Sequence, residues 1–481
     1  MKRLGGIVSN FFLLPAVLLS LTVWPITAGA AEFTLGGRVE FYVTWDSTQV
    51  SNTLSSFILR NNDPNFQHGR LKMSAERARL FFQMKGPQVW GAKTDGLIEF
   101  DWDSGSDVNT TPAGLPYSPH RPAPRLRLAF FRVIWPDTEL LMGHYWSLLS
   151  EEMPETADPR AALALAGLPH VREPQIRLSQ KFGPWTVGLA LCEPGNGNQG
   201  STLDPSQTAA NNNYPAESSE TPKVSGRIKY EQDLWGKAPY WGVPRCFSAR
   251  LASAWQRSRY RSFNANNART WGENDYQGLT VRQRDQQYLN QWIVEGSLFI
   301  PVLPTHNQVL AGTASLLTQW FVGAGVDNFA LDQPANSSLL RWQGFDSGLG
   351  QNVYDRELVR RFGGFVQAQY WFTNHWFLNA VWAMSRAFGV DRERNLSAPG
   401  GYGFATINNS SDPVKLNQNY KLTLYYQPIM ALKFGVEYAY IRADYFQRRN
   451  TSGNQNALTN VNQTADVGEN HRLMFWSCFF F

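Results

Sequence analysis

The chain ends at residues 471–481 with the stretch His471-Arg472-Leu473-Met474-Phe475-Trp476-Ser477-Cys478-Phe479-Phe480-Phe481. Leu473, Phe475, Phe479 and Phe481 fall on one face of a strand with a period of two, with Ser477 between them. Chain termini usually fray into solvent, whereas the last strand of a lipid-embedded barrel ends at a membrane interface, where aromatic rings are favoured. The stretch therefore predicts the closing strand of a barrel, and a hydrophobic tail docked on a soluble domain is the alternative.

The same alternation recurs along the chain. In residues 35–46, Val39, Phe41 and Val43 share one face and Arg38 and Glu40 the other, over a length close to a tilted membrane crossing. We predict strands at 35–46, 75–85, 98–103, 125–130, 139–147, 175–182, 185–192, 223–231, 247–257, 287–300, 310–322, 360–372, 376–386, 418–427, 430–445 and 469–481.

The connections between these strands alternate between short turns and long loops. Short turns are expected at Gly86-Pro87, Pro136-Asp137, Gly183-Pro184, Thr373-Asn374 and Pro428-Ile429. An even strand number lets the first and last strands meet antiparallel, which lipid requires because unpaired backbone groups there cost several kcal/mol. The fold class is thus all-β: a transmembrane antiparallel β-barrel of about 16 strands, with short periplasmic turns and long extracellular loops.

The start of the chain predicts export. Met1-Lys2-Arg3 is a basic head, residues 11–24 are apolar, and Ala28-Gly29-Ala30 is a small-residue cleavage site, so residues 1–30 are a signal peptide and 31–481 a single barrel domain. The net charge of +5, less the charges of Lys2 and Arg3, leaves +3, too near neutral to indicate a nucleic-acid partner. No apolar run reaches 18 residues after the signal, which excludes a helical span.

Cysteine use does not indicate disulfides or a metal. Cys192 and Cys246 fall near opposite rims of the predicted barrel and should not pair. No cysteine–histidine spacing resembles a zinc site, and we expect no cofactor.

Several motifs resemble those of the DcaP-like trimeric outer-membrane porins. They are the opening strand, the paired inward arginines, Gly143-His144-Tyr145-Trp146-Ser147, Pro154-Glu155-Thr156-Ala157-Asp158 and Gln175-Ile176-Arg177. The similarity covers most of the mature chain and is strongest from about residue 33 to 182. It implies a barrel of about 16 strands in the bacterial outer membrane that forms a homotrimer and passes small anionic solutes. Some members carry a coiled-coil segment before the barrel, which has no counterpart after Ala31.

A diffusion pore needs a narrowed lumen and a charge pattern. Residues 148–174 carry Glu151, Glu152, Glu155 and Asp158 and a run of small residues, and we predict that they fold into the lumen as a constriction loop. An ordinary external loop is the alternative.

Charged residues share the inward parity of the predicted strands. The basic ones are Arg38, Arg77, Arg79, Arg125, Arg127, Arg177, Arg227 and Lys229, and the acidic ones are Glu40, Glu99, Asp101 and Asp103. Stacked cations favour a passing carboxylate or phosphate, which predicts a mild anion preference. Internal ion pairing is the alternative, because polar lumen residues also satisfy one another.

Other functions have weaker support. HExxH, GxSxG and phosphate-cradling motifs are absent, so we expect no enzyme. Asp101, Asp103 and Asp107 have the spaced oxygens of a calcium site but lack the glutamate at position twelve of such loops. A sugar-preferring pore and a non-conducting surface or adhesin barrel remain alternatives, and the partners we expect are outer-membrane lipid and small hydrophilic solutes.

Overall fold

The computed structural model is almost entirely β-strand. The structure describes residues 32–48, 68–102, 124–158, 168–195, 219–261, 286–307, 309–329, 339–346, 351–390, 404–406, 414–448 and 457–481. The predicted signal peptide lies outside these parts and stays a prediction. No helix in them has the length and apolar character that a membrane span requires.

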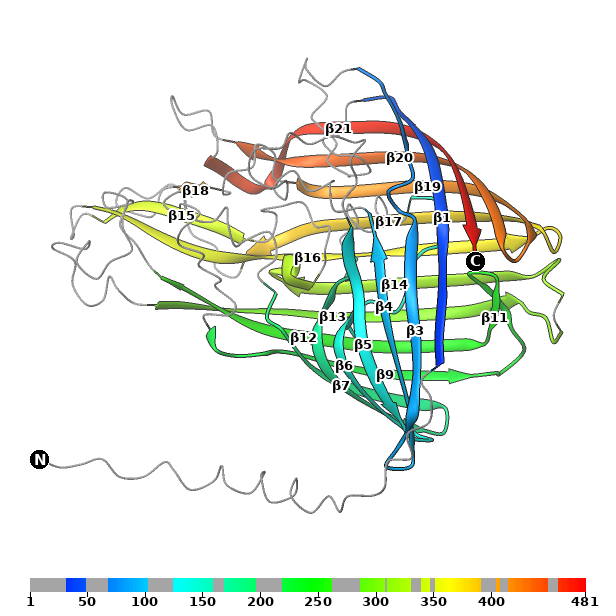
Figure 1. Ribbon diagram of the computed structural model, residues 1–481. Coiled ribbons are helices and arrows are strands. Elements are labelled where there is room, and N and C mark those ends of the chain that lie inside the picture. The colour runs from blue at the N-terminus through cyan, green and yellow to red at the C-terminus, as the bar shows by residue number, and fades with distance from the viewer. Residues whose placement is uncertain are drawn as a thin grey trace, which may run out of the picture.

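Sixteen antiparallel strands form a closed ring (Figure 1). The first wall contains β1 (Glu32–Asp46), β3 (Arg79–Val89), β4 (Ala92–Asp101), β5 (Arg125–Ile134), β6 (Thr138–Trp146), β7 (Arg172–Phe182), β8 (Trp185–Cys192) and β9 (Lys223–Gln232). The second wall contains β12 (Phe247–Arg261), β13 (Gln286–Leu303), β14 (Ala314–Ala324), β16 (Gln351–Trp371), β17 (Trp376–Val390), β19 (Val414–Ile429), β20 (Leu432–Arg448) and β21 (Ala457–Phe480).

The terminal strands close the ring. β21 pairs with β20 on one side and with β1 on the other, in register from Arg38–Phe480 to Asp46–Arg472. Gly37 and Phe481 exchange two backbone hydrogen bonds, of 2.9 and 3.1 Å. The prediction drawn from the last eleven residues is therefore confirmed.

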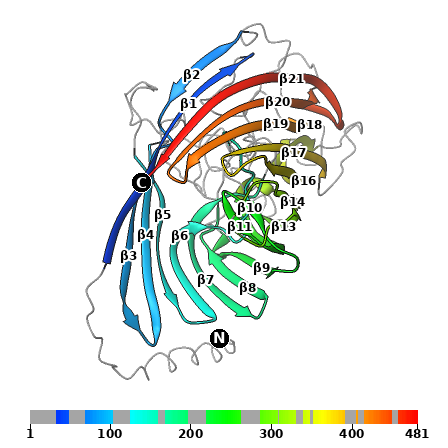
Figure 2. The same ribbon diagram turned by 90° about the vertical axis from the view of Figure 1, so that its right-hand side faces the viewer.

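The remaining elements extend or fill the ring. β2 (Arg70–Ser74) pairs with β1 beyond an interruption before β3, and β15 (Leu339–Asp346) and β18 (Phe404–Thr406) extend the sheet past β16 and β21. A 3₁₀ turn, η6 (Val326–Phe329), follows β14. β10 (Ala238–Tyr240) and β11 (Val243–Arg245) form a separate hairpin that lies inside the ring in Figure 2.

Burial along the strands is inverted relative to a soluble protein. On β21, Leu473, Phe475 and Phe479 are exposed, whereas Met474 and Cys478 are buried. The same pattern holds around the ring, with apolar side chains outside and glutamines, asparagines and charged groups buried within. An apolar outer face and a polar interior are what a lipid-embedded barrel requires.

All sixteen predicted strands overlap a strand of the ring, but some local predictions are wrong. The turn expected at Gly86-Pro87 lies at Trp90-Gly91, where both residues have positive φ (54° and 73°), the backbone of a tight hairpin turn. The turn expected at Pro428-Ile429 lies at Met430-Ala431, because β19 continues to Ile429.

A bulge in β5 overturns a predicted face. The β4–β5 register shifts around Arg127, so Leu126 faces outward while Leu128 lies inward with the arginines. We expected Leu126, Leu128 and Phe130 on one outer face; an extra residue in a strand reverses the alternation beyond it.

The three cysteines, Cys192, Cys246 and Cys478, are free thiols.

Candidate functional site

The described parts of the connection between β6 and β7 lie in the barrel interior. We call residues 147–171 the inner loop; the structure describes 147–158 and 168–171. β7 begins at Arg172, three residues before the predicted strand. Leu148 and Leu149 are fully buried and pack on inward-facing residues of β8 and of β12–β14, respectively.

Glu151 ties the inner loop to β9. Its carboxylate forms an ion pair with Arg227 and accepts a hydrogen bond from Lys229 Nζ at 2.7 Å. Burial alone would raise the pKa of Glu151, but the two cations outweigh it and lower the pKa to about 2. The carboxylate is therefore charged at neutral pH.

Glu155 anchors the inner loop on the opposite wall. Its carboxylate pairs with Lys433 of β20 and accepts a hydrogen bond from Gln369 Nε2 at 2.8 Å. Its backbone N–H donates to Gln367 Oε1 at 2.6 Å, and its carbonyl accepts from Asn379 Nδ2 at 2.7 Å. A buried charge with all these partners is fully compensated and holds the loop in one register.

The next residues reach the seam between β1 and β21. Ala157 N–H donates to Glu437 Oε2 at 2.7 Å, and its carbonyl accepts from Arg77 Nη1 at 3.2 Å. Asp158 pairs with Arg472, which also donates to Asp46 Oδ1 at 2.7 Å. The inner loop thus crosses from β9 to the closing strands.

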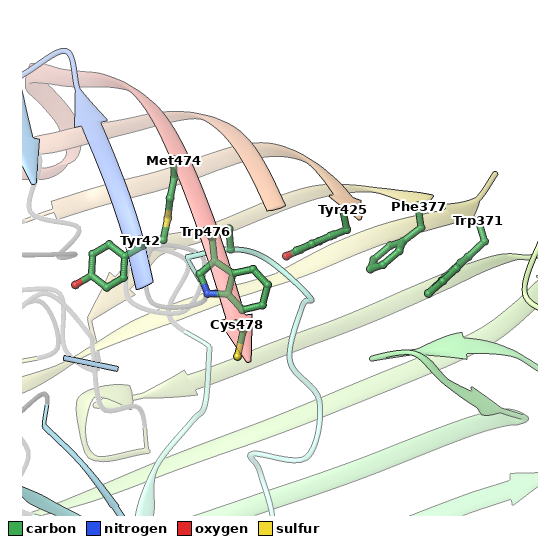
Figure 3. Close-up of a cluster of buried hydrophobic side chains, with 8 residues drawn as sticks. Tyr42, Trp371, Phe377, Tyr425, Met474, Trp476 and Cys478 are labelled. Carbon is green, nitrogen blue, oxygen red and sulfur yellow. The ribbon is translucent and has the colours of Figure 1, made fainter. Parts of the chain in front are cut away.

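A row of inward aromatic side chains lies under this crossing. Figure 3 shows Trp371, Phe377 and Tyr425 side by side on adjacent strands, with centroid separations of 4.1 and 4.7 Å. Ala157 packs on this cluster, and Lys433 Nζ lies 4.7 Å from the Phe377 ring centroid and 4.6 Å from that of Tyr425. The row is buried and forms the surface on which the inner loop packs.

A group of charged side chains on the first wall includes two arginines that remain partly exposed. Arg125 donates twice to Asp101, at 2.9 and 2.8 Å, and Arg127 bonds both Asp101 and Glu99. Arg79 lies 3.7 Å from Glu99. The side chains of Arg79 and Arg125 keep 29% and 26% of their surface exposed, in contrast to Glu155, which has none.

A second group lies further along the same wall. Arg132 pairs with Asp95 at 2.6 Å and approaches Glu139 at 3.4 Å, and Arg177 reaches Glu139 at 3.4 Å as well. Here two cations face two carboxylates, and the charges balance.

Arg172 joins the first group from the root of the inner loop. Its guanidinium lies 5.0 Å from the Trp146 ring centroid, and the centroid of the His170 ring lies 4.0 Å from that of Trp146. Nε and Nη1 of Arg172 are buried without a hydrogen-bond partner among the described residues. Burial and neighbouring arginines hold the pKa of His170 well below its usual value, so its ring is neutral.

All eight predicted basic residues make an ion pair with a carboxylate. Besides the pairs above, Arg38 and Arg77 both contact Glu40, at 2.6 and 2.9 Å. Arg77 does so from a turn between β2 and β3, although a continuous strand was expected there. The open alternative of internal pairing thus describes much of this set.

The acidic predictions divide by position. Glu40, Glu99 and Asp101 pair with the arginines. The carboxylate oxygens of Asp101, a calcium candidate in the sequence, contact the guanidiniums of Arg125 and Arg127. Asp103 and Asp107 lie outside the described residues. Among those that are described, no group of three or more metal-binding side chains comes together.

Sequence reasoning missed several residues of the interior. Arg132 was missed because the bulge at Arg127 reverses the inward parity of β5. Arg172 was missed because β7 was expected to begin at residue 175 and begins at Arg172. Lys433 and Arg472 lie on predicted strands, each alternating with the outward apolar positions, and that parity could have found them. Their pairing with Glu155 and Asp158 depends on the loop path, which no local pattern encodes.

Comparison with known proteins gives the fold. No family model and no curated protein matches the chain. Among solved structures it is similar to the outer membrane channel DcaP of Acinetobacter baumannii, with a TM-score of 0.60, 16% identity and coverage of 94% of this chain and 98% of that one.

It is also similar to an anion-selective porin from Comamonas acidovorans, with a TM-score of 0.45, 10% identity and coverage of 94% and 100%. At 16% identity, the similarity to the DcaP channel shows the fold alone. The resemblance to DcaP-like porins is confirmed at this level.

Proposed function

We propose that this protein is a porin of the bacterial outer membrane that lets small hydrophilic solutes diffuse through its barrel. One observation carries the proposal: the interior is divided. The inner loop packs tightly on β12–β21, whereas Arg79, Arg125 and Arg132 of the first wall keep 26–29% of their side-chain surface exposed. A solute path along β3–β7, narrowed by the loop, follows from this division.

We propose a mild preference for anions along this path. Among the described residues, Arg79, Arg125 and Arg127 gather with the two carboxylates Glu99 and Asp101. Arg172 adds a fourth cation, because it and Arg127 both lie over the Trp146 ring. Because paired charges cancel at a distance, a local excess of cations is what attracts a carboxylate or phosphate group. The balanced group around Arg132 adds little net field.

The aromatic row does not favour the sugar-preferring alternative. Stacking on a sugar needs an accessible ring face, and Trp371, Phe377 and Tyr425 are 1%, 0% and 2% exposed beneath the inner loop. Export through residues 1–30 and assembly as a homotrimer complete the proposal and rest on the sequence and its resemblance to DcaP-like porins. Mass measurement of the purified protein in detergent tests the trimer; a monomer would contradict it.

Liposome swelling tests the transport function. Vesicles containing the refolded protein are placed in a dicarboxylate or in a neutral sugar of matched size, both isotonic. We expect swelling in both, faster in the dicarboxylate. Equal rates would remove the anion preference, and the absence of swelling in either would indicate a non-conducting barrel.

A further inference from the structure

The connection between β9 and β12 is unusually long for the end of the barrel at which it lies. Most connections at this end are tight turns, such as Gly183-Pro184, and the β13–β14 connection spans 304–313, whereas this one spans 233–246 and contains its own hairpin, β10–β11. Trp241 and Gly242 at the hairpin tip have φ of 52° and 77°, the backbone of a tight two-residue turn. The hairpin is thus a built element.

The hairpin points into the barrel and is fixed at its root. Lys237 and Thr305 exchange backbone hydrogen bonds of 2.9 and 2.7 Å, which tie it to the β13–β14 connection. Trp235 Nε1 donates to the carbonyl of Pro301 at 2.7 Å. In Figure 2, β10 and β11 lie inside the ring beside β13.

The body of the hairpin shares a hydrophobic core with the wall and the inner loop. Ala238 is fully buried against Phe299 and Leu317, in a cluster that also contains Leu168 of the loop. Arg245 lies 5.0 Å from the ring centroids of both Tyr240 and Phe299. Because burying apolar surface is favourable, these side chains form an apolar layer between the inner loop and the wall, inside a lumen that is otherwise polar.

Two side chains of the hairpin hold consecutive residues of the inner loop. The Tyr240 hydroxyl accepts from Met153 N–H at 3.1 Å and lies 3.2 Å from the Met153 carbonyl, to which it donates. Arg245 makes two parallel bonds to Glu152, of 2.8 and 2.7 Å, and Glu152 is almost completely buried. Such a bidentate pair fixes geometry as well as charge.

The tip of the hairpin reaches Lys433, the residue that pairs with Glu155 of the inner loop. Lys433 Nζ, which pairs with Glu155, lies 5.8 Å from the Trp241 ring centroid. The hairpin therefore spans from β13 toward β20 beneath residues 152–155, and every described polar anchor of this part of the loop involves either the hairpin or the wall it covers.

We infer that the β10–β11 hairpin is a second specificity-determining element of the channel: it locks the inner loop on the second wall and so confines solutes to the first. This inference rests on the proposed function for its effect on solutes. Without the bonds from the hairpin, the inner loop moves away from the second wall and the solute path widens. The electric field of Arg79, Arg125, Arg127 and Arg172 then acts on a smaller share of the cross-section of the path.

The test uses the double variant Tyr240→Phe, Arg245→Met in the full-length refolded protein. Both substitutions keep most of the packing and remove the bonds to Met153 and Glu152. Val243→Ser is the matched control, because Val243 is exposed on the same hairpin. A variant with residues 238–245 replaced by Asn-Gly removes the element completely.

Hydrogen exchange of a peptide covering 150–157 and single-channel conductance are measured for each protein. We expect faster exchange, higher conductance and weaker anion selectivity in the double and replacement variants, and wild-type values in the control. Wild-type exchange in the double variant overturns the inference even if the protein conducts nothing. Faster exchange with unchanged conductance and selectivity overturns it too, because the lock would then not shape the path.

The two proposals fail separately. A wild-type protein that does not conduct contradicts the porin function, whereas a conducting wild type with unaffected hairpin variants contradicts only the inference. If the replacement variant does not fold, the double variant decides alone, since it alters no residue of the ring.

Discussion

At the residue scale, the interior is organised by carboxylates of the inner loop that each find cations on different strands. Glu151 pairs with β9, Glu152 with β11, Glu155 with β20 and Asp158 with β21. The carboxylates of Glu152, Glu155 and Asp158 are removed from bulk water, so breaking one of these pairs leaves an uncompensated charge. The four acidic residues therefore set the loop path.

The lowered pKa of Glu151 predicts acid resistance of the loop. A carboxylate whose folded pKa is lowered stabilises the fold above its unfolded pKa, and this stabilisation is lost as the pH falls from 4.5 through about 2. We expect Glu151 to keep its contacts between pH 7 and the unfolded pKa. Single-channel recordings across this range should show no transition assignable to Glu151; a Glu151→Gln variant that removed a transition near neutral pH would contradict this.

Arg172 predicts a selectivity change. A unit charge about 8 Å from a passing ion in water contributes roughly 0.5 kcal/mol. Its loss acts with opposite sign on anions and cations, so Arg172→Gln should lower the anion-to-cation permeability ratio roughly fivefold. Arg257→Gln is the control, because Arg257 packs on Trp255 and Tyr288 away from the cluster. Equal ratios in the wild type and the Arg172 variant would show that this guanidinium lies off the path.

At the element scale, the inner loop is the part of the site for which the sequence supplied an expectation but no partners. The acidic residues and small side chains of 148–174 indicated a loop suited to a lumen. Its partners could not be predicted, because Lys433 and Arg472 are about 300 residues away and meet the loop only after the ring has closed.

Glu155→Gln should release the loop. The substitution leaves Lys433 buried without its anion, and breaking a buried pair costs roughly 3–5 kcal/mol. We expect frequent current fluctuations in the open channel where the wild type is steady. Glu193→Gln, an exposed position after β8, is the control; a variant as quiet as the wild type would mean that Glu155 does not hold the loop.

The strands themselves were predictable where the alternation is strict. β1, β8 and β21 carry uninterrupted two-residue periods, and their faces agree with the expectation. The errors fall at irregularities: the bulge at Arg127 and the interruption between β2 and β3. A single inserted residue reverses every later side chain, and no composition signal marks it.

At the scale of the whole molecule, the ring depends on its seam. β1 and β21 are joined by a continuous ladder and by Arg472, which contacts both Asp46 and the inner loop. Closure and loop docking are therefore coupled, since Arg77 and Arg472 flank the seam and bind consecutive loop residues. The even strand number, inferred from the sequence, is what permits this antiparallel seam.

Deletion of residues 479–481 should prevent stable closure. It removes the last rungs of the β1–β21 ladder and the bonds between Gly37 and Phe481, and unpaired backbone groups in lipid cost several kcal/mol each. We expect the refolded protein to lose the compact, fast-migrating form on unheated gels. Phe481→Leu keeps the backbone bonds and should retain it; a compact truncated protein would contradict the role of the seam.

We propose that the ring encloses a water-filled path whose exposed wall carries an excess of positive charge. The reversal potential of the wild-type protein in a planar bilayer, under a gradient of potassium chloride, tests it most directly. We expect steady conductance with a reversal potential of the sign that chloride preference gives. Clear potassium preference, or no conductance through a correctly folded barrel, would contradict it.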